Sequence, residues 1–475
     1  MITFIVMENT VVKRNNNTID PESMASYSKP GPRYTSYPPA PVWKPAAGDV
    51  WYKKALRSAG QSKFPRQFSL YFHIPFCRAR CFFCGCNVAI RQKQEEADKY
   101  IDYVEKELNM VADWLAAGQT VVQLHWGGGT PTFLTVDQIR RLNAIIKSIF
   151  AVDMDAEVAV ETDPCQTSLE QLDALIESGF NRISIGVQDF DPAVQKAVNR
   201  IQSYRLTADH INHCRKRGVH SINVDLIYGL PFQNAENFAE TVKKIIDLKI
   251  ERIALYSFAY IPWIKPHQKG IPKEALPVPV EKARIFLKAR DLFLNADYEQ
   301  IGMDHFALQS DELSLALKNK RLYRNFMGYT IQRAEQYLGF GSSSIGYIQS
   351  SFFQNQREIK DYYRAIDEGK IPVMREYRLT GEDKIRQWVI MTLMCQTVIS
   401  FEEFNKKFNV PFFEHFHKEK ESLIQAENEG LIIITDDELK LTETGRVLMR
   451  NVAMIFDQYL PSGEEKTKPL FSQTV

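Results

Sequence analysis

The sequence lacks several features that mark large classes of proteins. No apolar run in its 475 residues approaches the roughly 18 needed to cross a bilayer. The formal net charge is only +1, so bulk charge indicates neither a nucleic-acid partner nor a membrane surface. The short apolar start has no basic region and no cleavage site of a signal peptide. We therefore expect a cytoplasmic protein whose acidic ligands are met by locally placed cationic side chains.

Cysteine is scarce and unevenly placed. Of the seven cysteines, four fall between residues 77 and 86, and the other three are isolated. In a chain without a secretion signal, such clustering indicates a metal site rather than disulfides. We interpret the isolated cysteines as small buried apolar residues. They are Cys165, Cys214 and Cys395.

Six short β-rich runs alternate with amphipathic helical stretches from about residue 67 onward. Two of the helical stretches are Ala97–Ala116 and Leu169–Ser178. Successive strand–helix units predict a parallel sheet with right-handed crossovers. Six units are too few for a complete barrel, so a partial, open barrel and a doubly wound sheet are the alternatives. The predicted strands are Phe68–Ile74, Val121–Trp126, Glu157–Glu161, Arg182–Val187, Ser221–Ile227 and Arg252–Phe258.

The alternation of strands and helices ends after the sixth predicted strand. A proline-rich stretch follows and precedes a long predicted helix at Glu281–Asn295. From about residue 380 the pattern is helices plus one hairpin, Leu431–Ile434 and Leu439–Leu441, which is similar to a winged helix. That shape often binds DNA, but the segment has no basic stripe, so we expect no nucleic-acid partner. We predict four regions: an N-terminal tail and substrate-capping segment (1–65), a barrel (66–270), a barrel-completing substrate region (271–375) and a helical C-terminal domain (376–475).

The clustered cysteines have the spacing C-x3-C-x2-C-x-C over Cys77, Cys81, Cys84 and Cys86. Structural zinc normally uses two ligand pairs separated by a longer loop, and no second pair follows here. Iron–sulfur clusters are held by closely spaced cysteine thiolates. Three thiolates on a [4Fe–4S] cluster leave the fourth iron open to a further ligand. The motif therefore favours an iron–sulfur cluster over zinc.

Candidate site residues gather at the carboxyl ends of the predicted strands. The cysteines follow the first strand, Gly127–Gly129 follows the second, and Glu161 ends the third. Gln188 and Asp225 lie near the ends of the fourth and fifth. Barrels and open α/β sheets place their active sites at this edge. The glycine triplet is either a tight turn or a close approach to a ligand. Glu161 is either a solvated loop carboxylate or a ligand contact, and Arg200 either forms a surface salt bridge or pairs with a ligand carboxylate.

These motifs resemble the radical S-adenosylmethionine superfamily and, within it, the coproporphyrinogen III dehydrogenase branch. The superfamily places an aromatic residue before the third cysteine, here Phe83. The fourth cysteine and the segments Pro30–Pro38 and Gln123–Pro131 are similar to the coproporphyrinogen III dehydrogenase branch. The resemblance runs from about residue 27 to 460. Further matches are Phe180–Phe190, Val198–Arg200, Asp225–Pro231, Ile301–Phe306, Arg324–Phe326, Gly328–Thr330 and Gln354–Gln356.

The resemblance implies a fold and a reaction. The expected fold is α/β, a partial (β/α)6 TIM-like barrel with an N-terminal extension and a smaller, mainly helical, winged-helix-like C-terminal domain. The expected reaction converts two propionates of coproporphyrinogen III to vinyl groups without oxygen, which gives protoporphyrinogen IX. A reduced [4Fe–4S] cluster cleaves S-adenosylmethionine, and a 5′-deoxyadenosyl radical then removes hydrogen from the propionate β-carbon. The expected protein is a monomer that takes electrons from a donor such as a flavodoxin or ferredoxin and binds no membrane.

The resemblance also assigns site residues and two molecules of S-adenosylmethionine. The expected cluster ligands are Cys77, Cys81 and Cys84, with Cys86 near the reaction centre but not on the cluster. The expected contacts to the cluster-bound molecule are Tyr71, Gly128, Glu161, Ala259 and Ile345. The expected contacts to the second molecule are Phe83, Gly129, Thr130, Gln188, Arg200 and Asp225.

The N-terminal motif is a candidate substrate contact. Coproporphyrinogen carries four carboxylates, and the nearly neutral chain must meet them with local cations, so we expect Arg33 and Tyr34 to touch substrate. The alternative is a structural turn at Pro30–Pro32 with an exposed arginine.

The sequence departs from the branch at two places. Cys165 and Gln166 stand where the branch has Arg-Glu, and Gly341–Gly346 is richer in serine than usual.

Other functions compete with the oxidase. They are a haem chaperone or a haem-processing paralogue of the same superfamily, and a non-catalytic metal protein. The chaperone-type relatives usually have Phe at the position of Cys86 and lack the Pro30–Pro38 motif, so both features favour the oxidase. A non-catalytic protein gives Glu161, Gln188 and Asp225 no shared role.

Overall fold

The computed structural model describes residues 19–61, 67–115, 118–332, 334, 336–460 and 471–474. The first 18 residues of the predicted N-terminal segment, and the end of the helix predicted over Ala97–Ala116, lie outside these ranges. In the described part of the chain, no helix is long and apolar enough to cross a membrane.

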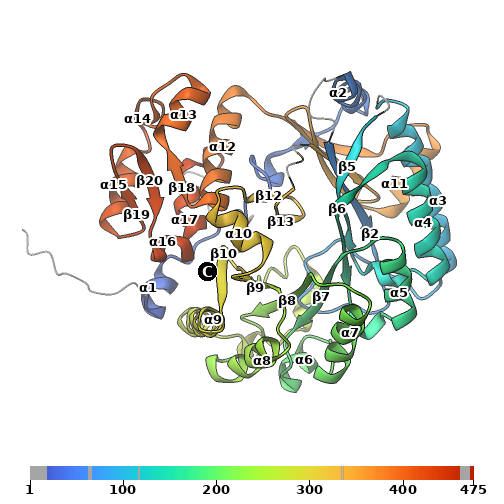
Figure 1. Cartoon of the computed structure of the whole chain (residues 1–475), viewed down its shortest axis with the longest axis horizontal. Helices are drawn as coiled ribbons and strands as arrows, with labels where there is room; N and C mark the ends of the chain where they lie inside the picture. The colour runs from blue at the N-terminus through green and yellow to red at the C-terminus, as the bar shows by residue number, and fades with distance from the viewer. Residues whose placement is uncertain are drawn as a thin grey trace, which may run out of the picture.

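One 13-stranded sheet forms the frame of the molecule, and its centre is the predicted half barrel (Figure 1). Six neighbouring strands are parallel and appear in sequence order, which confirms the partial (β/α)6 arrangement. Each predicted strand is found, the third beginning six residues earlier than expected. These strands are β2 (Gln67–Ile74), β5 (Thr120–Gly128), β6 (Ala151–Thr162), β7 (Arg182–Gln188), β8 (Ile222–Tyr228) and β9 (Arg252–Ser257).

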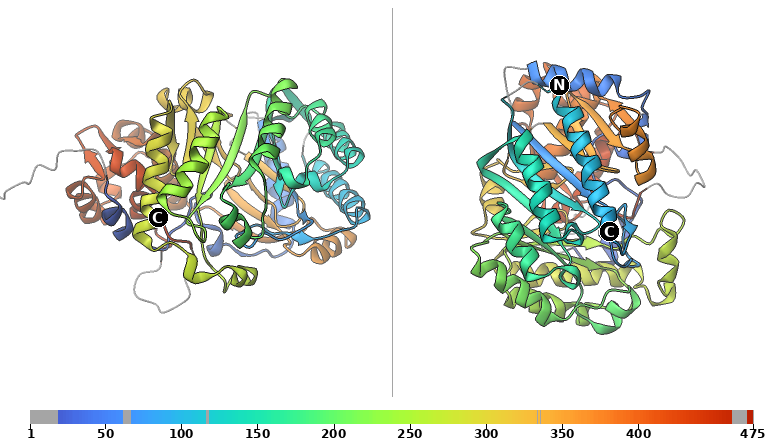
Figure 2. Two further views of the ribbon diagram at one scale, coloured as in Figure 1. Left: turned by 90° about the horizontal axis from the view of Figure 1, so that it is seen from below. Right: turned by 90° about the vertical axis from the view of Figure 1, so that its right-hand side faces the viewer.

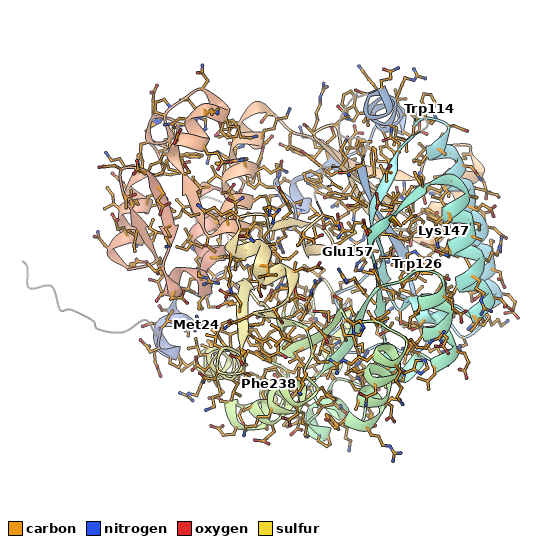
Figure 3. The ribbon with its side chains drawn as sticks, in the orientation of Figure 1. Met24, Trp114, Trp126, Lys147, Glu157 and Phe238 are labelled. Atoms are coloured by element: carbon orange, nitrogen blue, oxygen red, sulfur yellow. The ribbon has the colours of Figure 1, made fainter. Side chains whose placement is uncertain are left out.

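Helices cover the convex outer face of this half barrel, on the right and below in Figure 1. Their apolar faces meet the sheet in one core, where Trp126 of β5 and Phe238 of α8 are fully buried (Figure 3). Polar caps begin several of them; Thr135 and Gln138, for example, form a capping box on α4. The helices are α3 (Glu95–Ala112), α4 (Val136–Ile149), α5 (Leu169–Glu177), α6 (Pro192–Ala197), α7 (Tyr204–Lys216), α8 (Ala235–Asp247) and α9 (Pro279–Leu294).

The sheet continues beyond the predicted strands on both sides. Next to β9 lie the antiparallel strands β11 (His305–Leu308) and β10 (Tyr298–Gly302). Next to β2 lies a seventh parallel strand, β14 (Gln336–Phe340). It is followed by antiparallel β15 (Ile345–Ile348), β16 (Ser351–Asn355), β17 (Val373–Arg378) and β1 (Lys44–Pro45). Sequence reasoning missed these strands because most are short, and because β14 and β1 pair with strands that lie far away in the chain.

Smaller elements fill the concave side and the edges. The hairpin β12 (Tyr323–Asn325) and β13 (Gly328–Thr330) lies inside the curve of the sheet (Figure 1). Strands β3 (Phe76–Cys77) and β4 (Ala89–Ile90) bracket the cysteine segment. The other helices before residue 381 are α1 (Pro21–Ser26), α2 (Val50–Gln61), α10 (Glu312–Lys318) and α11 (Ile359–Asp367).

The C-terminal part combines helices with a three-stranded sheet in the order β18-β20-β19. The predicted hairpin is present as β19 (Ile432–Ile434) and β20 (Glu438–Leu441), and β18 (Val398–Ser400) is an additional strand. Phenylalanine rings, including Phe404, Phe412 and Phe416, pack its core. The helices are α12 (Gly381–Gln396), α13 (Phe401–Phe408), α14 (Phe412–His415), α15 (Lys420–Asn428), α16 (Glu443–Val447) and α17 (Met449–Ala453).

The segment that follows α1 lies beside residues 471–474, and the left view of Figure 2 shows α1 close to the C-terminus. Gly31 N–H donates to the carbonyl of Ser472 (3.0 Å), and Thr474 N–H donates to that of Lys29 (2.8 Å). Arg450 of α17 donates to carbonyls of both segments, including those of Pro32 and Gln473. The N-terminal segment is therefore held against the C-terminal domain rather than hanging free.

Candidate active site

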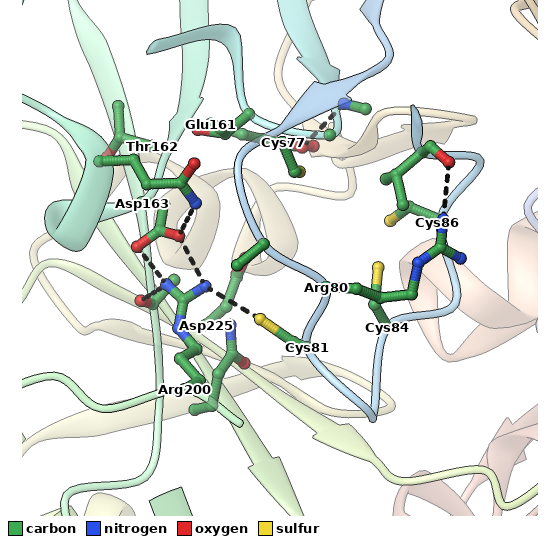
Figure 4. A pocket seen from close by; sticks show the side chains of 18 of the residues that line it. Cys77, Arg80, Cys81, Cys84, Cys86, Glu161, Thr162, Asp163, Arg200 and Asp225 are labelled. Atoms are coloured by element: carbon green, nitrogen blue, oxygen red, sulfur yellow. Dashed lines mark hydrogen bonds and ion pairs between the residues drawn. The ribbon is translucent and has the colours of Figure 1, made fainter. Parts of the chain in front are cut away.

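A cavity of about 150 Å³ lies at the carboxyl ends of the barrel strands (Figure 4). It brings together residues predicted from six separate places in the sequence. Of the predicted site residues, Cys77, Cys81, Phe83, Cys84, Cys86, Gly128, Gly129, Thr130, Glu161, Gln188, Arg200 and Asp225 all line it. A second cavity, of about 130 Å³, shares Glu161, Ser184 and Asp225 with the first and continues into the barrel interior. We call these the cysteine cavity and the interior cavity.

The cysteine loop is fixed by contacts from several elements. Its two ends pair as β3 and β4, with Arg91 N–H donating to the Cys77 carbonyl (2.9 Å). The Asn199 side chain donates to the Arg80 carbonyl (3.0 Å), and Lys265 donates to the Cys86 carbonyl (3.0 Å). These contacts hold the backbone of the loop while leaving its thiols facing the cavity (Figure 4).

The cysteine thiols fit an iron–sulfur cluster. All are free, and Cys77, Cys81 and Cys84 are half-buried. Burial raises the pKa of Cys77 to about 12, so this thiol ionises only beside a strong positive charge such as iron. A hydrogen bond with Cys86 lowers the pKa of Cys84 to about 6, which favours its thiolate. Three sulfurs around a half-buried cavity are a suitable donor set for a cluster.

The positions of the acidic, histidine and cysteine side chains show whether a single metal ion, such as zinc, could be held instead of a cluster. Across the described ranges, no three or more such residues are placed to hold a single metal ion. Ligands of one zinc ion converge on one point, whereas the thiolates of a [4Fe–4S] cluster each bind a different iron. The described residues therefore offer no site for a single zinc ion.

Glu161 is oriented by the neighbouring strand. His125 Nε2 of β5 lies 3.2 Å from Glu161 Oε1, and Gly128 N–H donates to Oε2 (3.2 Å). Burial alone would raise the pKa of this carboxyl, but the His125 and Gly128 contacts bring it below its usual value. His125 in turn stacks on Tyr71 (5.9 Å between ring centroids). Glu161 is thus held as a carboxylate at the cavity wall.

The glycine triplet lets β5 pass close to the other walls of the site. A Cβ on Gly127 would lie 2.7 Å from Glu161 Oε1, and one on Gly129 would lie 2.5 Å from the Phe76 carbonyl oxygen. Gly128 has φ +117°, a conformation that favours glycine. Close packing within the protein therefore explains the triplet, and Gly128 and Gly129 reach the cavity as a consequence.

Arg200 is an integrated part of the site and not a surface group. Its side chain is 11% exposed and pairs with Asp163 (3.0 Å). It also donates to the Gly186 carbonyl (2.7 Å) and lies 3.9 Å from Cys81 Sγ (Figure 4). The surface salt bridge considered for Arg200 is wrong, because its partner Asp163 lies in the cavity wall as well.

Two buried polar atoms at this wall lack a partner among the described residues: Arg200 Nε and Gln188 Oε1. Gln188 also adopts φ +69°, which is uncommon for a residue with a side chain. Asp225 of β8 accepts from Asn223 (2.8 Å), and burial, with the nearby Glu161 charge, raises its pKa to about 7. Buried groups that lack partners are the kind of atoms that a ligand satisfies.

Three predicted cofactor contacts lie outside the lining of the cysteine cavity. Tyr71 of β2 is buried, with its hydroxyl 3.1 Å from His73 Nδ1. Ala259 presents a carbonyl that accepts from Gln268 (3.0 Å). Ile345 of β15 packs in a separate apolar cluster with Trp43 and other residues. Their contacts to a cofactor stay predictions.

Most of the N-terminal motif is buried, so the exposed arginine of the alternative interpretation is wrong. Arg33 pairs with Asp304 and lies over the Tyr256 ring (5.2 Å), one wall of the interior cavity. Tyr34 is only 1% exposed, and its hydroxyl donates to Asp457 (2.9 Å). Arg33 is therefore placed near the interior cavity, whereas Tyr34 contacts the C-terminal domain.

Sequence reasoning missed several residues of the cavity wall. Asp163, Arg80 and Gln166 line it, and His267 lies 2.8 Å from the Cys84 carbonyl. Asp163 carried a usable signal, since it stands directly after the third strand like the neighbouring Glu161. His267 carried none, because it comes from a loop almost 200 residues away from the cysteines.

Family models and curated relatives both match this chain. The Radical SAM superfamily model matches residues 71–245, and the HemN C-terminal domain model matches residues 379–448. An oxygen-independent coproporphyrinogen III oxidase of Helicobacter pylori is 40% identical over 96% of this chain and 100% of its own. The oxidase of Escherichia coli K12 is 40% identical over 91% and 94%.

The chain belongs to the family of oxygen-independent coproporphyrinogen III oxidases. The solved structure of coproporphyrinogen III oxidase (HemN) from Escherichia coli, which is described as a radical SAM enzyme, superposes with a TM-score of 0.86. It covers 90% of this chain and 98% of its own at 39% identity. The α/β fold with its C-terminal domain is thus that of the oxidase family, and membership implies S-adenosylmethionine and a [4Fe–4S] cluster.

Proposed function

We propose that this protein converts coproporphyrinogen III to protoporphyrinogen IX without oxygen. Each of two propionates loses a hydrogen atom from its β-carbon, then carbon dioxide and one electron, and becomes a vinyl group. The observation that carries the proposal is the cysteine cavity, where three free thiols face Glu161, Arg200 and Asp225 at the strand ends. A non-catalytic metal protein needs none of these facing groups.

The residues around this cavity have separate roles in the proposed reaction. Cys77, Cys81 and Cys84 hold the cluster. When bound, the cluster and S-adenosylmethionine supply the electron transfer and the carbon radical that takes the substrate hydrogen. Glu161, fixed by His125, accepts hydrogen bonds from the ribose or ammonium group of the cluster-bound molecule.

A second molecule of S-adenosylmethionine is supported by the unpaired atoms on the opposite wall. Gln188 Oε1 accepts a hydrogen bond, Arg200 donates one to a carboxylate, and Asp225 faces an ammonium group. Strand placement of Gln188 and Asp225 keeps these groups rigid. The cluster-loaded wild type is expected to bind two equivalents in anaerobic equilibrium dialysis.

The matched test of this second site uses two arginines. Arg200→Ala is expected to reduce binding towards one equivalent with an unchanged cluster spectrum. Arg205→Ala is the control, because Arg205 lies on α7 and is 91% exposed. The second site is ruled out if the wild type binds one equivalent or if Arg200→Ala still binds two.

Arg33 is the proposed contact for a substrate propionate. It lies over the ring of Tyr256, one wall of the interior cavity, and would exchange Asp304 for the propionate. Arg33→Gln alone leaves a buried carboxylate unpaired, so Arg33→Gln/Asp304→Asn is the better variant. We expect it to keep the cluster and to raise KM at least tenfold. Unchanged kinetics in the double variant would remove Arg33 from the substrate site.

The decisive experiment is anaerobic turnover. Cluster-loaded protein, a chemical reductant, S-adenosylmethionine and coproporphyrinogen III are incubated, and the porphyrins are separated after oxidation. Protoporphyrin in the wild type, but not in Cys81→Ser, supports the oxidase. Haem binding without turnover supports the chaperone instead. A flavodoxin or ferredoxin as donor, a monomeric state and a cytoplasmic location are further parts of the proposal, and each needs its own measurement.

A further inference from the structure

A third cavity, of about 690 Å³, lies between the barrel and the C-terminal domain. Its walls come from residues 35–37, the β12–β13 hairpin, β14, β15, β16, α12 and α13. It shares no lining residue with the cysteine cavity or the interior cavity. The hairpin separates them: Arg324, Asn325 and Thr330 line the large cavity, whereas the turn at 327–329 lines the interior cavity. We call it the interdomain cavity.

The charge of the interdomain cavity is one-sided. Its described lining contains Arg324, Lys384 and Lys407, and no aspartate or glutamate. Neither Lys384 nor Lys407 forms an ion pair with any residue in the ranges that the structure describes, and both are exposed at the rim. Arg324 is buried, donates to the Tyr34 carbonyl and leaves its Nε without a partner there. Unpaired cations facing one space attract an anion of several charges.

The rest of the lining suits a large ring system. Aromatic side chains of β14, β15, β16, α12 and α13 line the cavity, together with several glutamines. Aromatic faces bind flat ligands and cations, while amides donate hydrogen bonds to carboxylates. The volume falls within the range of about 300–1,000 Å³ that is usual for small-molecule sites. The aromatic residues include Tyr337, Phe352, Trp388 and Phe408.

We propose that the interdomain cavity is a second tetrapyrrole-carboxylate site, separate from the place of radical attack. The inference rests on the proposed function, which supplies a macrocycle with four carboxylates as substrate and one with two as product. In this arrangement the macrocycle lies against Trp388 and Tyr337, and propionates reach Lys384 and Lys407. A substrate molecule before reaction and a product molecule before release are both carboxylated macrocycles that this site could bind. They differ in the number of carboxylates, four against two.

Binding is measured with stable porphyrins on the full, cluster-loaded chain. The probes are coproporphyrin III, protoporphyrin IX and coproporphyrin III tetramethyl ester, which has no free carboxylates. Trp388 lines the cavity, so a bound porphyrin quenches its fluorescence, and Trp388→Phe removes that part of the signal. Tighter binding of coproporphyrin indicates a substrate site, and equal or tighter binding of protoporphyrin indicates a product site. Equal binding of the ester overturns the proposal.

The variant Lys384→Gln/Lys407→Gln tests the cations. We expect it to weaken coproporphyrin binding at this site at least tenfold and to keep the cluster spectrum. Lys406→Gln is the matched control, since Lys406 is an exposed neighbour on α13 that does not line the cavity. If the double variant binds coproporphyrin like the wild type, the inference fails, although turnover by the wild type still upholds the proposed function. If the wild type makes no protoporphyrinogen, the proposed function fails whatever the binding result.

Discussion

At the scale of single residues, the four clustered cysteines have different surroundings. Cys77, Cys81 and Cys84 are half-buried, whereas Cys86 is exposed. We expect serine at any of the first three positions to abolish most of the oxygen-labile absorbance and iron, because one iron then lacks its anionic ligand. Cys86→Ser is expected to keep the cluster and to lose decarboxylation. Iron and sulfide quantitation checks this, and iron loss in Cys86→Ser with retention in Cys84→Ser would contradict the assignment.

Glu107 of α3 is a buried carboxyl far from the cysteines. It is 1% exposed and accepts from Gly341 N–H (2.8 Å), the Asn355 amide (2.6 Å) and the Tyr362 hydroxyl (2.7 Å). Burial outweighs these hydrogen bonds and raises its pKa from 4.5 to about 7. The folded state therefore holds a proton that the unfolded chain releases between these two values.

The consequence of Glu107 is a pH-dependent stability. Its contribution is fully present below pH 4.5 and is lost as the pH rises through 7, by up to about 3 kcal/mol. Relative to Glu107→Gln, which cannot titrate, the wild type should lose that much unfolding free energy between these pH values. Urea unfolding of both metal-free proteins across the pH range measures this. A difference that stays flat with pH would contradict it.

At the scale of elements, one glycine sets the approach of a helix to a strand. Gly445 of α16 packs against Leu431, the residue directly before β19. A Cβ added to Gly445 would lie 1.9 Å from the Leu431 carbonyl oxygen. Gly445→Ala is expected to destabilise the C-terminal domain by about 1–3 kcal/mol through overpacking. Gly381→Ala at the start of α12 is the control, because nothing lies within 4 Å of its added Cβ. Thermal unfolding should show a loss in the first variant alone.

The extra strands show which elements are visible in a sequence. The parallel strands β2 and β5 to β9 are apolar and punctuated by helices, so their pattern is local and all were predicted. Strands β14 to β17 are recognised only by their pairing with β2 and with each other. The pairing of β14 with β2 joins residues more than 250 positions apart, which no short window of sequence contains. Strands β15 to β17 pair with near neighbours, but they are short and follow no helix-punctuated pattern.

At the scale of the whole molecule, Arg450 joins both ends of the chain to the C-terminal domain. It donates to carbonyls of the N-terminal segment and of residues 473 and 474. Arg450→Met should release both segments together, since their backbone acceptors lose one shared donor. Hydrogen exchange should accelerate at least tenfold at residues 30–38 and 471–474. Acceleration at only one segment would contradict a shared anchor.

The amino-acid sequence by itself determined the half barrel, the clustering of four cysteines in one loop and the gathering of Glu161, Gln188 and Asp225 at one edge. These depend on local periodicity and on the rule that parallel strands end on the same side. Only the tertiary structure decided that Arg200 pairs with Asp163, that Tyr34 is buried against Asp457 and that a cationic cavity lies between the domains. Those features arise where distant segments meet, and their energies depend on partners that no single segment contains.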